Sequence, residues 1–290
     1  MNPDEYNKLR FESNYKSFEW LHIQTEEERN SFNAQPYKKD ISILYVPADC
    51  CLLIDFKEFI TTKPTLFFCG YQRIQLLKGK NAISLNYSRD FYCIQIHDAE
   101  VACDGLLFQN AGQFPATELS PEEHLIIQNL FSEIGKELRL KDSSVEEMVR
   151  ILLKQIIIRA TRLWKQQQLP GELLETPAEV EFYRNFNQLV EIHFKKWHAV
   201  ADYASALGLS AKTLSNKFNK LNLNQPNEII KSRILLEAKR LLCFTDWSAK
   251  EIAYELGYED PAYFNRLFTG KVGDSPSVFK KKFNEGKKVQ

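Results

Sequence analysis

Apolar residues recur along this chain with two different periods. Between residues 41 and 110 they form short runs, rich in β-branched and aromatic residues, separated by turn signals such as VPAD, TKP and KGKN. The runs are ISILYV, CLLIDF, TLFFCG, RIQLL, AISLNY, FYCIQI and GLLFQ. Short strands at this spacing predict an antiparallel β-sandwich or small barrel.

The period changes to that of a helix near residue 119. Ser120 suits a helix N-cap, Pro121 suits the first helical position, and Glu123 follows three residues after the cap. Apolar residues at helical spacing predict one helix from Pro121 and a second over about 144–168. The apolar stripe of the second helix is too wide to face one small sheet. We expect part of it either to pack on the N-terminal domain or to form a dimer interface.

A segment with two prolines and a glycine, LPGELLETP at 169–177, separates these helices from the rest of the chain. After it the pattern is one of short helices without strands. A chain of 290 residues is about twice the usual domain size. We therefore expect an α+β protein with an N-terminal β-domain over 1–118, dimerisation helices over 119–168, a linker over 169–177 and an all-helical domain over 178–290.

The helical domain contains an internal repeat, in which an alanine precedes a glycine by four residues and two large apolar residues and a proline follow. The two copies are Ala204, Gly208, Leu214, Phe218 and Pro226, and Ala253, Gly257, Phe264, Phe268 and Pro276. A helix-turn-helix needs a small residue where its helices cross, a glycine that tolerates positive φ in the turn, and an i,i+4 apolar pair on the buried face. Each copy therefore predicts one helix-turn-helix.

The second helix of each copy is expected over about 210–220 and 260–271, with Ser210 and Asp260 as N-caps. The segment 226–244 between the copies has the apolar spacing of one helix of about 17 residues, roughly 25 Å long. Such a helix could hold the two second helices about one DNA turn, roughly 34 Å, apart, so that both enter the major groove. The alternative is a helical domain that uses these units only for packing.

Charge is uneven, although Lys+Arg 38 balance Asp+Glu 38 over the whole chain. Residues 177–290 hold 18 Lys and Arg against 13 Asp and Glu, which is a mild indication of an anionic partner.

No run reaches the roughly 18 apolar residues of a membrane helix, and the N-terminus has no apolar signal core, so we expect a cytoplasmic protein with no membrane partner. The six cysteines are too few for a disulfide scaffold. Cys50 and Cys51 are interpreted as reduced thiols, with a redox-sensing pair as the alternative.

The second copy carries a longer pattern, IAYELGYEDPAYFNRLFTGKVGDSPSVFKKKF at 252–283, and the helix before it has the arrangement R-x4-A-x2-L-L from Arg233 to Leu242. On these residues the C-terminal part resembles the DNA-binding domain of the AraC/XylS family of bacterial transcription regulators. The resemblance implies a sequence-specific DNA-binding transcription regulator, an activator or a repressor, whose two recognition helices read adjacent major-groove segments. Leu223 stands where the family usually has glycine, so the first recognition helix is expected to end differently.

The resemblance also implies contact residues. Arg266 is the best candidate for a base contact, because arginine pairs bidentately with guanine, and a phosphate contact is its alternative role. The full set of expected base contacts is Lys212, Ser215, Asn216, Ala262, Asn265 and Arg266. The expected phosphate contacts are Ser210, Lys220, Lys231, Arg233, Lys239 and Lys271.

The N-terminal strands and helices resemble the cupin-like sensing domain of many family members. This second resemblance implies a small-molecule effector. The two resemblances together imply double-stranded DNA, RNA polymerase and a second copy of the chain as partners. An aromatic effector pocket would include Phe56, Phe68, Tyr71 and Phe91, although core packing explains these residues equally well. The metal motif of enzyme-type cupins is absent and His97 stands alone, so we expect no metal and no cofactor.

Two other classes of function stay open. One is a helical protein-interaction module that does not bind DNA. The other, with the least support, is a cupin-type enzyme, for which the sequence offers no catalytic constellation.

Overall fold

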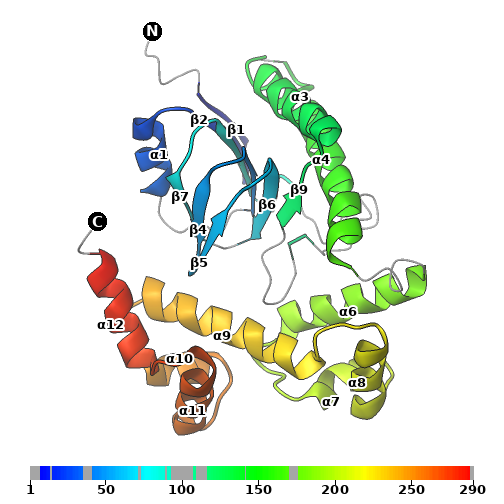
Figure 1. Ribbon diagram of the computed structural model, residues 1–290, viewed down its shortest axis with the longest axis vertical. Coiled ribbons are helices and arrows are strands. Elements are labelled where there is room, and N and C mark those ends of the chain that lie inside the picture. The colour runs from blue at the N-terminus through cyan, green and yellow to red at the C-terminus, as the bar shows by residue number, and fades with distance from the viewer. Residues whose placement is uncertain are drawn as a thin grey trace. The chain divides into compact units, whose positions relative to one another are not determined.

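The computed structural model describes residues 7–13, 15–34, 41–70, 73–88, 90–92, 107–108, 116–140, 142–169 and 176–287. The chain divides into two compact units, one formed by residues 1–110 and 114–174 and the other by residues 111–113 and 175–290. The first unit holds the strands and the first three described helices, and the second unit is helical (Figure 1). Among the described residues, no helix combines the length and the hydropathy needed to cross a membrane.

The first unit contains two antiparallel sheets. The larger has the order β1 (Lys8–Ser13), β2 (Lys16–Ile23), β8 (Ala82–Tyr87), β3 (Ile41–Val46), β6 (Thr65–Gly70) and β9 (Ala116–Glu118). The smaller has the order β5 (Lys57–Ile60), β4 (Cys51–Ile54) and β7 (Ile74–Lys78).

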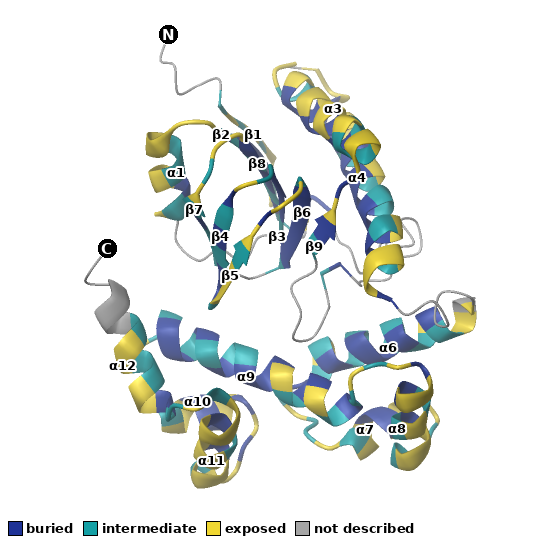
Figure 2. Ribbon diagram, viewed as in Figure 1, coloured by how far each residue is buried: buried dark blue, intermediate teal, exposed yellow. Residues whose placement is uncertain are grey.

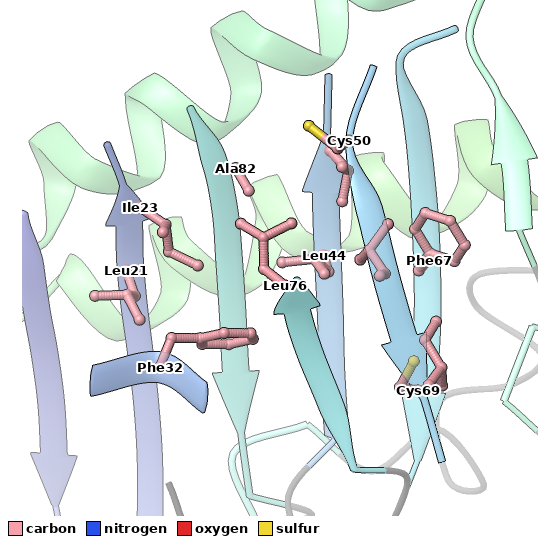
Figure 3. Packing of buried hydrophobic residues seen from close by; sticks show 12 residues of the cluster. Leu21, Ile23, Phe32, Leu44, Cys50, Phe67, Cys69, Leu76 and Ala82 are labelled. Carbon is pink, nitrogen blue, oxygen red and sulfur yellow. The ribbon is translucent and has the colours of Figure 1, made fainter. Parts of the chain in front are cut away.

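The inner faces of the two sheets form one apolar cluster (Figure 3). Leu44 of the larger sheet and Leu76 of the smaller are both fully buried in it. Phe32 of the short helix α1 (Glu26–Asn33) joins this cluster. These side chains alternate along their strands with residues that face the other way, as the period of a strand requires.

The outer face of the larger sheet is covered by helix α3 (Pro121–Glu137), which packs against α4 (Val145–Gln168). The indole Nε1 of Trp20 donates a hydrogen bond to the carbonyl oxygen of Phe131 at 3.0 Å. Gly135 allows this close approach, because a Cβ there would lie 3.3 Å from the Trp20 ring. The central strands are therefore buried on both faces, which explains why ISILYV and TLFFCG are almost continuously apolar.

The expected order of an antiparallel β region followed by a helical domain is confirmed. Five of the seven apolar runs form strands β3, β4, β6, β7 and β8, and the runs at 91–96 and 105–109 fall mostly outside the described residues. Helix α3 begins at Pro121, and Ser120 accepts a hydrogen bond from the Glu123 amide, as predicted.

Some elements of the first unit were not predicted. Strands β1, β2, β5 and β9 were missed. Both β1 and β5 are edge strands, with polar side chains at four of six and two of four positions respectively. Helix α1 was also missed, although Thr25 and Glu28 form a capping box whose T-x-x-E spacing is readable in the sequence.

The second unit consists of α6 (Pro177–His193), α7 (Val200–Ala206), α8 (Ala211–Lys220), α9 (Pro226–Phe244), α10 (Ala249–Glu255), α11 (Pro261–Val272) and α12 (Pro276–Lys287). Helices α7 and α8 form one helix-turn-helix, α10 and α11 form the other, and α9 joins them, as the repeat predicted. Helix α9 is buried along most of its length, whereas α8 and α11 each keep an exposed face (Figure 2).

Candidate nucleic-acid interface

The two turns are built in the same way. Gly208 has φ 69° and Gly257 has φ 79°, a region that favours glycine. The alanines four residues earlier, Ala204 and Ala253, are buried where the helices cross. In each copy the carbonyl of this alanine accepts a hydrogen bond from the turn, from the amide of Leu209 or Tyr258. The positive φ at both glycines therefore follows from the backbone path of the turn.

Side-chain caps fix where the two recognition helices begin. The Ser210 hydroxyl accepts from the Thr213 amide at 3.1 Å. The Asp260 carboxylate accepts from the amides of Ala262 at 2.8 Å and Tyr263 at 3.2 Å. The buried face of each helix is the expected i,i+4 pair, and all four side chains are fully buried: Leu214, Phe218, Phe264 and Phe268.

With these faces buried, the expected base-contact residues point to solvent. Lys212 and Asn216 are exposed on α8, and Ser215 is half-buried. Ala262, Asn265 and Arg266 are exposed on α11, and the Arg266 side chain keeps 69% of its surface. Each α11 position lies 50 residues after its α8 counterpart, so the two helices present equivalent positions.

Two exposed residues on these faces were missed by the sequence reasoning. Tyr263 is 51% exposed on α11, and Thr213 is exposed at the equivalent position of α8. The signal was available, since each lies three residues before an expected base contact, Arg266 or Asn216, and helix periodicity places such positions on one face.

The two recognition helices end differently, as Leu223 in place of glycine predicts. Helix α8 ends at Lys220, and Asn222 takes the left-handed conformation at φ 52°. Helix α11 ends at Val272, and Gly273 takes that conformation at φ 89°. Asparagine is one of the few residues other than glycine that adopts this conformation readily.

The expected phosphate contact by Arg233 is wrong. Its side chain is 9% exposed and is held inside the second unit by two carboxylates. Its Nε lies 2.9 Å from a Glu191 oxygen, its Nη1 lies 3.0 Å from a Glu237 oxygen, and its guanidinium stacks 3.9 Å from the Phe194 ring. A buried guanidinium with two ion-pair partners is not available to DNA.

The other expected phosphate contacts differ in how accessible they are. Lys220 is exposed. The ammonium of Lys271 is 2.6 Å from a Glu228 carboxylate oxygen, and the Ser210 hydroxyl serves as a helix cap. Lys231 is half-buried. Lys239 is also half-buried, with Nζ 5.6 Å from the centre of the Phe279 ring, and burial lowers the pKa of its ammonium.

Two of the four residues expected to form an effector pocket, Phe68 and Phe91, are packed inside the first unit. Phe68 is 1% exposed and meets Phe108 edge-on at 5.4 Å, and Phe91 is 2% exposed and lies 4.9 Å from Phe18. Phe56 is half-buried, and Tyr71 lies outside the described residues. Packing therefore accounts for Phe68 and Phe91.

A different hollow of about 400 Å³ lies between α3 and the larger sheet. Its floor includes His22, Ile83 and Tyr45, which the strand register places in one row across β2, β8 and β3. Its other lining residues, none of them acidic, are Trp20, Asn81, Gln128, Ser132, Gly135 and Arg139. The Tyr45 hydroxyl lies 3.2 Å from Nδ1 of His124.

The described residues contain no group of three His, Cys, Asp or Glu side chains that could hold a metal ion, and His97 lies outside them. Burial raises the pKa of the Cys50 thiol, which disfavours the reactive thiolate.

The second unit is similar in sequence to known helix-turn-helix proteins. A family described as "Helix-turn-helix domain" matches residues 203–282. Histidine kinase P4 of Formosa agariphila is 28% identical over 153 residues, which are 50% of this chain and 11% of that protein. The HTH-type transcriptional activator Btr of Bacillus subtilis is 34% identical over 93 residues, which are 32% of this chain and 17% of that protein.

Among solved structures, ToxT from Vibrio cholerae aligns with 94% of this chain and 96% of its own at a TM-score of 0.43 and 13% identity. By contrast, the matched part of this chain spans only 11% of histidine kinase P4 and 17% of Btr. The match to residues 203–282 agrees with the paired helix-turn-helix geometry found there. The C-terminal region of this chain is a helix-turn-helix domain of the AraC/XylS type.

Proposed function

We propose that this protein is a sequence-specific DNA-binding transcription regulator that inserts α8 and α11 into adjacent segments of the major groove. The observation that carries the proposal is the equivalence of two capped helices that expose the same positions, 212 and 216 on one and 262 and 266 on the other. Helix α9, with 19 residues, is about 28 Å long, close to the roughly 34 Å of a DNA turn.

Chemistry assigns each residue a role in this arrangement. Arg266 suits guanine, and Asn216 and Asn265 suit adenine. Lys220 and Lys231 supply phosphate contacts, which position the protein without reading sequence. If the protein is an activator, its protein partner would be RNA polymerase. The protein would act in the cytoplasm.

The test is selection of bound sequences from random duplex DNA by the full chain. An enriched motif with two parts about one helical turn apart is the expected result. Absence of any enriched motif at low salt, with folded protein, contradicts the proposal. The rival function, a protein-interaction module, predicts no steep salt dependence of DNA binding, because that dependence comes from phosphate contacts.

Control by a small molecule is the second part of the proposal, and the hollow beneath α3 is its site. The hollow is lined by the aromatic rings of Trp20 and Tyr45 and by Arg139 and His22, and its described lining residues include no carboxylate. These features favour a small organic anion with an apolar body. The site replaces the aromatic pocket expected from the sequence.

Dimerisation through α4 is the third part. Most of the apolar stripe of this helix is buried within the first unit, but Met148 is 38% exposed and Ile151 is 41% exposed one turn further on. A second copy of the chain would cover this pair. Light scattering of the parent and of Met148→Asp tests it, and a monomeric parent would contradict it.

A further inference from the structure

The stretch 193–198, which comprises the last residue of α6 and most of its connection to α7, touches both helix-turn-helix units. We call it the bridge segment. On one side it is bound to the first helix-turn-helix. The Trp197 ring stacks on His193 at 3.7 Å and meets the Tyr203 ring edge-on at 5.4 Å. The hydroxyl of Tyr203, a fully buried residue of α7, donates to the carbonyl of Trp197 at 2.9 Å.

On its other side the bridge segment contacts the turn of the second helix-turn-helix. The His198 imidazole Nε2 lies 2.9 Å from the carbonyl oxygen of Leu256, to which it donates. The same ring stacks on Tyr258 at 4.3 Å, and Lys195 forms an ion pair with Glu255. The backbones of the two segments also lie close together, since a Cβ on Gly257 would collide with the carbonyl oxygen of Lys195.

These contacts continue to the recognition helix. The Tyr258 ring lies 5.5 Å from Phe264, the first buried anchor of α11. Beside it, a hollow of about 260 Å³ is lined by Lys231 and Ile234 of α9 and by Tyr263 and Leu267 of α11. On this side α11 faces α9 across the hollow, so the contacts of the bridge segment add to the ion pair between Lys271 and Glu228 in holding α11 on α9.

We propose that the bridge segment, through His198 and Lys195, fixes the distance and rotation between the two recognition helices and thereby determines which spacing of two DNA half-motifs the protein accepts. These are positioning residues that touch no base. The inference rests on the proposed function. A change of one base pair in the spacing moves one half-motif by about 3.4 Å along the duplex, so a rigid bridge discriminates between spacings and a loosened bridge discriminates less.

The experiment uses the full chain and duplexes that carry the two selected half-motifs at the native spacing, with one base pair removed, or with one added. A fourth duplex carries one half-motif alone. The variants are His198→Ala and Lys195→Gln. The Lys195 side chain is 41% exposed, so its variant is expected to fold even if the first does not. Glu259→Gln, at an exposed position two residues after Gly257, is the matched control.

The expected result is that both variants lose about fivefold of the preference for the native spacing, while affinity for the single half-motif stays within about twofold. His198→Gln keeps an N–H donor and should recover part of the preference. The inference is overturned if the variants keep the spacing profile of the control, or if they lose affinity equally on all four duplexes. If the parent protein selects no motif, the proposed function itself fails, which is a distinct outcome.

Discussion

The carbonyl oxygen of Lys195 occupies the space that a side chain on Gly257 would need. The equivalent glycine of the first helix-turn-helix, Gly208, has no atom within 4 Å of such a position. Both glycines have positive φ, so the two turns share one conformational requirement and differ only in what lies against them. The asymmetry marks the second turn as the one that the bridge segment holds.

This pair of glycines gives a matched stability prediction. Gly208→Ala should lower the free energy of unfolding by about 1 kcal/mol, the cost of a left-handed alanine. Gly257→Ala should cost about 2 kcal/mol more, because the backbone of the bridge segment must also move. Urea unfolding of the full chain, followed by circular dichroism, measures both. Equal costs would show that the contact with Lys195 is dispensable.

Arg266→Ala should weaken DNA binding by about 1–3 kcal/mol and relax the preference at one base position. Lys220→Ala should instead weaken binding to all sequences alike and reduce the salt slope by about 1, because it removes only a phosphate contact. Titrations against the selected site and against single-base variants separate the two. If Arg266→Ala lowers affinity without changing site preference, Arg266 contacts phosphate.

In the proposed complex, the ion pair between Lys271 and Glu228 would compete with a DNA phosphate for the lysine. Glu228→Gln should therefore strengthen binding at low salt and steepen the salt slope by up to about 0.9, the value for one added phosphate contact. Glu133→Gln makes the same change of charge on α3, where it pairs with Lys136, and serves as the control. Identical slopes for the two variants would show that Lys271 does not reach the DNA backbone.

Acid should destabilise the junction of α6 and α9 through Glu237. Burial acts to raise the pKa of this carboxyl, but its ion pairs with Arg233 and Arg240 outweigh burial and hold the pKa below its usual value. A depressed folded pKa gives stability that is present above the unfolded value, about 4.3, and is lost as the pH falls through the folded value.

The free energy of unfolding should therefore fall between about pH 5 and pH 3. Glu237→Gln should be less stable at pH 7 and should show a flatter dependence over that range. Glu259→Gln should behave like the parent. A parent and a Glu237→Gln variant with parallel pH profiles would be inconsistent with this role.

Ligand binding beneath α3 can be tested with benzoate and naphthoate, each compared with its neutral carboxamide. The carboxylates should bind better because Arg139 and His22 line the site. Burial lowers the pKa of His22, more than nearby Glu28 raises it, and a bound anion would favour its charged form. Carboxylate affinity should therefore rise as the pH is lowered from 8 to 6.

Quenching of Trp20 fluorescence reports this binding, and Arg139→Gln should remove the preference for the charged compound. Arg10→Gln, at an arginine of strand β1 that pairs with Glu12, is the control. Equal binding of acids and amides would argue against an anionic effector.

Some elements of this protein could be predicted from local sequence patterns, and others could not. The positions of Ala253, Gly257, Asp260 and Phe264 were readable in advance, because each satisfies a local requirement of a turn, a cap or a buried face. Strand β1 was not readable, because its polar residues pair with β2 only after the chain has folded. Arg233 was misread because its sequence neighbours do not reveal Glu191, which reaches it from α6.

By itself, the sequence of this protein determined the two helix-turn-helix units, the helix between them and the faces that α8 and α11 expose, since periodicity, capping and turn chemistry act within a few residues. Only the tertiary structure decided which of the expected phosphate-contact lysines are exposed and where the first unit has a hollow. It also decided that residues 193–198 contact both helix-turn-helix units. These features depend on residues 40 or more positions apart, such as Lys195 and Glu255. Their contacts arise from packing, which no local pattern encodes.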